Sequence, residues 1–264
     1  MLVGCFGLER FKKMMKRIIR QIERLFFKKI DWTNISMITV GTKNQLNREE
    51  WLEKAIKQIP AGSRILDAGA GELRYKRFCS HLDYISQDFA QYDGKGNNRG
   101  LHSDSWDTSK IDIISDITAI PEPDASFDAI MCIEVFEHLP DPIKAIQEFA
   151  RLLKSGGLLI LTAPFCSLTH QAPYHFYSGF NRYFYEKHLS ASGFKIIELE
   201  ENGNFFEYLA QEVRRIPEVA QRYSDESKRT YFELIATKIC LSMLERFSKK
   251  DGVDLVNYYT LGAI

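Results

Sequence analysis

The sequence predicts an α/β protein built on a doubly wound, largely parallel sheet. Short apolar segments alternate with helical ones between residues 60 and 200, and a glycine-rich turn follows the first apolar segment directly. Strands that alternate with helices are typical of parallel βαβ units. The 264 residues are 45% hydrophobic and 27% charged, which is typical of a globular chain with a sizeable core and excludes a disordered chain.

The N-terminal segment predicts a basic amphipathic helix and linker over residues 1–46. Residues 1–30 hold nine basic and two acidic residues, a net charge of +7, although the whole chain is neutral. Apolar residues recur there at helical spacing. We weigh three roles for this helix: packing on its own domain, peripheral contact of residues 8–29 with an anionic membrane surface, and binding of a partner helix or nucleic acid.

The central segment predicts the alternating elements one after another. A helix over residues 47–59 ends at Pro60 and Gly62, and a second helix, over 141–153, is followed by a glycine pair. The predicted strands are 64–68, 84–87, 112–116, 127–133, 157–163 and 194–199.

The C-terminal segment changes this rhythm. Residues 204–248 look helical, with Pro217 predicted to break the run, and residues 253–261 read as a strand. We therefore expect one domain over residues 47–264, with a helical insertion before its last strand.

The turn in RILDAGAGELRY (64–75) carries the most information about a ligand. Asp67 ends a predicted strand, two glycines follow, and a helix is expected to start near Glu72. Arg74 stands where a dinucleotide-binding turn has its third glycine, and the carboxylates would repel a pyrophosphate. The turn thus favours a ligand with cationic groups.

Five segments in order resemble the class I S-adenosyl-L-methionine (SAM) dependent methyltransferases, in particular the methyltransferase-11-like group. They are DAGAG (67–71), YISQD (84–88), SDITAIP (115–121), IEVFEHLPDP (133–142) and LKSGGLLILTAPF (153–165). The resemblance implies a Rossmann-like seven-stranded sheet whose last strand is antiparallel, and SAM as the cofactor. Leu73 departs from the pattern, because the common turn has a third glycine there.

The resemblance also implies a set of SAM-binding residues. Asp88 would bind the ribose hydroxyls and Asp116 would lie near the adenine. The full set is Asp67, Gly69, Ala70, Gly71, Asp88, Phe89, Asp116, Ile117 and Glu134. The alternatives are purely structural: Asp67 and Asp116 could cap turns, Asp88 could be a solvated loop residue, and Glu137 with His138 could begin a helix.

The loop after the fifth predicted strand, residues 164–189, is where acceptor groups are expected, because ligands of open α/β sheets bind beyond the carboxyl ends of the strands. His170 and His175 are the candidate catalytic bases, with His138 third, since histidine can take up a proton near neutral pH. Each could instead be a packing or surface histidine. The residues predicted to shape the acceptor pocket are Tyr174, Tyr177, Asn181 and Arg182.

These features predict a SAM-dependent methyltransferase that acts on an oxygen or nitrogen of a small-molecule or glycan/lipid-linked acceptor. The alternatives are an NAD(P)-dependent oxidoreductase and a non-catalytic scaffold with the same fold. The five cysteines are scattered, so we expect neither a zinc site nor disulfides, and no metal-ligand spacing is visible. We expect a cytoplasmic protein, with the membrane contact above as an option, and no nucleic-acid partner.

Overall fold

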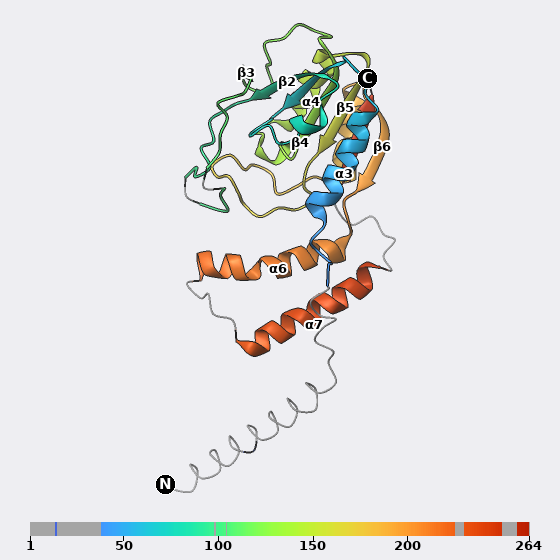
Figure 1. The fold of residues 1–264 in the computed structure, drawn as a ribbon. Coiled ribbons are helices and arrows are strands. Elements are labelled where there is room, and N and C mark those ends of the chain that lie inside the picture. Colours follow the sequence, from blue (N-terminus) through green and yellow to red (C-terminus); the bar gives the residue numbers. More distant parts are fainter. Residues whose placement is uncertain are drawn as a thin grey trace.

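Seven strands form a single sheet in the order β3-β2-β1-β4-β5-β7-β6 (Figure 1). The computed structural model describes residues 14, 38–97, 99–103, 105–224, 230–249 and 258–263. Strand β7 runs antiparallel to β5 and β6, whereas β1 to β5 pair in parallel. The predicted sheet with an antiparallel last strand is confirmed. The strands are β1 (Arg64–Ala68), β2 (Asp83–Asp88), β3 (Ile113–Ile114), β4 (Phe127–Ile133), β5 (Leu153–Thr162), β6 (Lys195–Glu201) and β7 (Tyr258–Ala263).

Helices cover both faces of the sheet because the central strands are apolar on both sides. On one face Leu52 and Ile56 of α3 (Asn44–Lys57) pack against alternate residues of β1 and β4. On the other face lie α4 (Pro142–Leu152) and α5 (Arg182–Ala191). Burial on both faces is typical of a parallel sheet.

The helical insertion forms two helices, α6 (Phe205–Tyr223) and α7 (Tyr231–Ser248). They lie beyond the carboxyl ends of the parallel strands, next to each other (Figure 1). The prediction that Pro217 breaks the run is wrong, because α6 continues through it. A proline removes one backbone hydrogen bond, but tertiary contacts also hold this helix: the Arg214 guanidinium donates to the carbonyls of Val40 and Ile38.

The segment after β1 also differs from the prediction. Instead of a helix near Glu72, residues 71–75 form turns, followed by the short 3₁₀ helix η1 (Lys76–Phe78). Leu73 has a φ of 59°, a left-handed conformation through which a right-handed helix cannot run. Helix α3 begins three residues earlier than predicted, at Asn44.

Predictions for the basic N-terminal helix, including membrane contact through residues 8–29, lie outside the described residues apart from Met14. Among the residues that the structure describes, none of the helices is long and apolar enough to span a membrane.

Candidate active site

The glycine turn is held against the end of β2 by backbone hydrogen bonds. The amides of Gly69 and Ala70 both donate to the carbonyl of Gln87 at 2.9 Å. Gly69 has a φ of 79°, and a Cβ there would lie 2.6 Å from a methyl group of Val135. The turn therefore requires glycine both for its conformation and for the close approach of Val135, which follows β4.

Asp88 lies at the end of β2 and completes this turn. Its Oδ2 accepts from the amide of Gly71 at 2.9 Å, and its Oδ1 accepts from the amide of Ala90 at 2.8 Å. The residue is only 6% exposed, so it is not an ordinary solvated loop carboxylate. Each carboxylate oxygen can accept a further hydrogen bond, which a pair of ligand hydroxyls could supply.

The other predicted cofactor residues have distinct surroundings. Asp67 is buried and accepts from the Tyr84 hydroxyl at 2.6 Å. Asp116 is exposed, and its Oδ1 accepts from both the amide and the hydroxyl of Thr118 at 2.8 Å. These are the contacts of a residue that caps a turn, which is the purely structural role considered for Asp116 as the alternative to SAM binding. Beside it Ile117 is buried, and the Phe89 ring meets that of Tyr174 edge-on at 4.9 Å.

Trp106 is a neighbour of the glycine turn that the sequence analysis missed. Its Cζ2 lies 2.6 Å from the position that a Cβ on Gly71 would take. Its ring also meets that of Tyr92 at 5.9 Å. Trp106 lies in the connection between β2 and β3, where no motif marks it, and a lone tryptophan in a polar loop is the only signal that could have found it.

Glu134 follows β4 in a strained conformation. Its φ is 57°, which costs a non-glycine residue roughly 1–2 kcal/mol and often marks a functional site. Its Oε1 accepts from the Thr162 hydroxyl at 2.9 Å, and its Oε2 pairs with Arg48 of α3 at 3.0 Å. Sequence analysis missed Arg48, which lies in an otherwise ordinary helix.

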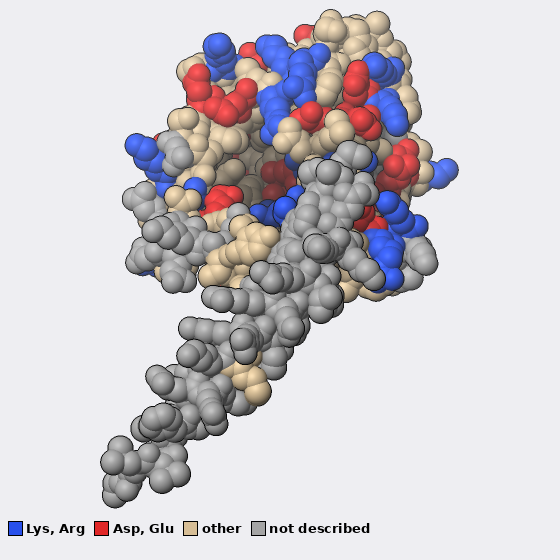
Figure 2. All heavy atoms as spheres, turned by 60° about the horizontal axis from the view of Figure 1, so that its bottom comes forward, with Lys and Arg blue, Asp and Glu red and all other residues tan. Residues whose placement is uncertain are grey.

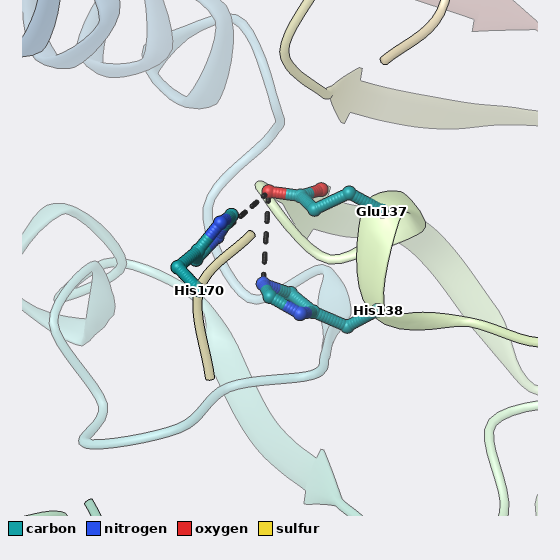
Figure 3. A group of neighbouring side chains, drawn as sticks. All are labelled: Glu137, His138 and His170. Carbon is teal, nitrogen blue, oxygen red and sulfur yellow. Dashed lines mark ion pairs between the residues drawn. The ribbon is translucent and has the colours of Figure 1, made fainter. Parts of the chain in front are cut away.

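The three candidate histidines come together at the carboxyl ends of β4 and β5. Ring centroids lie 4.7 Å apart for His138 and His170, and 4.7 Å apart for His170 and His175. His138 belongs to the short 3₁₀ helix η2 (Phe136–His138), and Figure 3 shows His138 and His170 turned toward Glu137. Their roles as bases stay predictions.

Burial lowers the pKa of these histidines. It brings the pKa of His138 to about 4, with the neighbouring histidines adding to the effect. Burial also lowers the pKa of His170 and, together with His170, that of His175. All three imidazoles are therefore neutral near pH 7, so their unprotonated nitrogens can accept a proton or bind a metal.

A cavity of about 530 Å³ opens beside this cluster. Its wall is built from the start of α3, the connection before β3, the ends of β4 and β5 and the helix α6. The lining includes Arg48, Glu134, Glu137, His170, Tyr208 and Arg215. A hollow with acidic side chains inside it is visible from the side of α6 and α7 (Figure 2). Tyr208 and Arg215 of α6 place part of the helical insertion in the wall of this cavity.

The four residues predicted to shape the acceptor pocket do not line this cavity. Asn181 caps α5 by accepting from the amide of Phe184, and Arg182 pairs with Glu186 within the same helix. The Tyr177 hydroxyl donates to a backbone carbonyl at 3.3 Å, and the Tyr174 carbonyl contacts His138. Side chains of α6 in the helical insertion line the cavity instead of these four residues, because they extend across the carboxyl ends of the strands.

Comparison with known sequences identifies the central segment. Residues 66–161 match the model of a methyltransferase domain family. A ubiquinone biosynthesis O-methyltransferase from Xanthomonas oryzae is 36% identical over 105 residues, 39% of this chain and 43% of that protein. One from Xylella fastidiosa is 36% identical over 117 residues, 42% of this chain and 46% of that protein. The matched segments thus span less than half the length of these relatives.

Comparison with solved structures agrees at the level of the fold. A candidate sarcosine dimethylglycine methyltransferase from Galdieria sulphuraria has a TM-score of 0.51 at 17% identity, over 83% of this chain and 85% of that one. The family match favours a methyltransferase over the oxidoreductase alternative. The sequence match assigns residues 66–161 to a methyltransferase domain, and the strand order and the solved structure agree with the class I methyltransferase fold.

Proposed function

We propose that the chain transfers the methyl group of SAM to an oxygen atom of a small hydroxyl-bearing acceptor. The observation that carries this proposal is the cavity at the ends of β4 and β5, with His170 in its wall. Its volume of about 530 Å³ lies within the roughly 300–1,000 Å³ of small-molecule sites. The O-methyltransferase relatives favour oxygen over nitrogen as the atom that is methylated.

The residues of the glycine turn fit the proposed cofactor. Gly69 has no side chain, and a Cβ at this position would collide with Val135. Asp88 offers two carboxylate oxygens to a ribose diol. SAM supplies an electrophilic methyl group on a positively charged sulfur. Buried and half-buried carboxylates at Asp88 and Glu134 suit that charge, whereas they would repel the pyrophosphate of a dinucleotide.

The chain contributes chiefly by positioning the acceptor. Holding two reactants in line can supply about 7–11 kcal/mol of a barrier. Tyr208 and Arg215 of α6 form part of the cavity wall against which an acceptor would be held. Of the three candidate histidines, His170 lines the cavity; it is the candidate to take the hydroxyl proton, with His175 next to it.

The cofactor assignment is tested by the substitution Asp88→Ala. We expect SAM binding, measured by calorimetry, to weaken by roughly 10-fold or more, because hydrogen bonds to a charged group contribute about 1.5–3 kcal/mol. The amide of Gly71 also loses its acceptor. Asp83→Ala serves as the matched control, because Asp83 lies at the opposite end of β2 and its carboxylate is exposed.

Three results would count against the proposal. Unchanged SAM affinity in Asp88→Ala would remove the ribose contact. Binding of NADH but not SAM by the unaltered chain would favour an oxidoreductase. Tight SAM binding without methylation of any hydroxyl compound in an acceptor screen would favour the non-catalytic alternative.

A further inference from the structure

Two segments bring three metal-binding side chains to one point. Glu137 and His138 lie on η2 after β4, and His170 lies in the loop after β5. The Nε2 atoms of His138 and His170 lie 3.7 and 3.9 Å from the same oxygen, Oε1 of Glu137 (Figure 3). All three ligand atoms lie within 4.8 Å of one another, so an inward movement of roughly 0.5 Å would bring them to metal-bond distances of about 2.0–2.2 Å.

Backbone carbonyls set the tautomer of both imidazoles. Nδ1 of His138 lies 2.5 Å from the carbonyl oxygen of Tyr174, and Nδ1 of His170 lies 2.8 Å from that of Leu168. A carbonyl oxygen only accepts, so each Nδ1 carries the proton and donates. Each neutral ring therefore turns an Nε2 lone pair toward Glu137, and a hydrogen bond from the other ring nitrogen is the usual support of a metal-bound histidine.

Glu137 is a deeply buried carboxyl group in the wall of the cavity. The residue is 2% exposed, and its Oε2 has no hydrogen-bond partner within the described part of the chain. Burying a carboxylate without a partner is costly, and a bound cation would remove that cost. Glu134 itself already contacts Arg48 and Thr162.

We propose that Glu137, His138 and His170 bind a divalent transition-metal ion beside the cavity, with open positions for a hydroxyl oxygen of the acceptor. Two imidazoles and one carboxylate suit zinc, cobalt, iron or manganese better than magnesium or calcium. Glu137 and His170 both line the cavity, so an ion between them would be accessible to an acceptor. The metal-binding part stands alone, whereas the acceptor part rests on the proposed function.

The ion would activate the acceptor hydroxyl, and each bond that breaks or forms in the transfer can be named. A metal-bound hydroxyl has a lowered pKa, so its O–H bond would break and the proton would leave to water or to His175, because with a metal bound His170 is a ligand and no longer the base. The oxygen then forms a bond to the methyl carbon while the C–S bond breaks, and that electron pair stays on sulfur. The proposed site differs from the sequence-based expectation of no zinc site, which rested on local spacing and could not detect ligands separated by β5.

The test is metal binding by the full chain after treatment with a chelator. Zn²⁺, Co²⁺ and Mg²⁺ are titrated separately by calorimetry, and Co²⁺ also by visible absorption. We expect one equivalent of Zn²⁺ or Co²⁺ to bind at least 100-fold more tightly than Mg²⁺. The substitutions His170→Ala and Glu137→Gln should each weaken binding by 10-fold or more, and His188→Ala on α5 is the matched control.

Circular dichroism of each variant separates lost ligation from lost folding, and His170, whose side chain is 25% exposed, is the variant least prone to unfold. Absence of a one-to-one complex, or unchanged affinity in both His170→Ala and Glu137→Gln, would overturn the metal site. SAM affinity of the metal-free chain is measured in parallel. Metal binding without SAM binding would leave the site standing and remove the proposed methyl transfer.

Discussion

At the scale of single residues, Asp67 shows how burial changes a carboxyl group. It is 2% exposed, and burial raises its pKa from 3.8 to about 7, with the Asp88 charge adding to the rise. The folded state therefore retains a proton that the unfolded chain releases. The stability that this residue contributes is fully present below pH 3.8 and is lost as the pH rises to about 7.

The substitution Asp67→Asn should remove this dependence on pH. We expect the free energy of unfolding of the unaltered chain, relative to the variant, to fall by up to about 4 kcal/mol between pH 4 and pH 8. Urea unfolding at several pH values measures it. The exposed Asp83 offers a matched control, Asp83→Asn. Parallel curves for the unaltered chain and Asp67→Asn would show that Asp67 ionises as a solvated carboxyl does.

At the scale of elements, the contact between α6 and the segment before α3 closes one wall of the cavity. The amide of Gly41 donates to Oε2 of Glu207 at 2.6 Å, and the Ser248 hydroxyl donates to Oε1 of the same residue at 3.0 Å. A Cβ on Gly41 would lie 2.4 Å from the amide nitrogen of Gln211. This close approach of two backbones fixes where α6 crosses the ends of the strands.

Gly41→Ala should therefore displace α6. We expect it to lower the free energy of unfolding by about 1–3 kcal/mol more than Gly62→Ala does, and to weaken acceptor binding. Gly62 is the matched control, because its φ of 80° resembles the 74° of Gly41 while nothing lies within 4 Å of its Cβ position. Thermal unfolding of both variants measures the loss of stability. Equal losses of stability would mean that backbone strain, rather than the α6 contact, makes glycine necessary at position 41.

At the scale of the whole molecule, charge and apolar surface are unevenly distributed. The chain is neutral overall, but residues 1–30 carry a net charge of +7. On α6 and α7 several large apolar side chains are more than half exposed, among them Ile216, Phe232 and Ile239. A basic segment and an exposed apolar surface together suit an anionic membrane surface.

Removal of residues 1–30 should abolish binding to anionic vesicles. We expect the full chain to sediment with phosphatidylserine-containing liposomes and to dissociate at high salt, because salt screens the attraction between charges. The shortened chain should stay in the supernatant. If both chains sediment with the vesicles, another surface makes the contact. If neither sediments, membrane contact is excluded.

Much of the fold is predictable because its signals are local. The limits of β1 and β4 agree with the predicted segments, since each is a short apolar run between polar residues. The errors occur where tertiary contacts outweigh local preference: α6 continues through Pro217, and Leu73 adopts a conformation that glycine usually takes. The acidic ends of β1 and β2 were predictable as neighbours, because carboxyl ends of parallel strands meet at one edge.

Residue order alone was enough to predict the doubly wound sheet, the glycine turn beside Asp88 and a histidine-bearing loop after β5. Folding in three dimensions decided that His170 faces Glu137, that Trp106 covers Gly71 and that α6 closes the cavity. The physical reason is the range of the interactions. Strand and turn preferences act between neighbours in the chain, whereas a site assembled from distant segments depends on how the helices pack against the sheet.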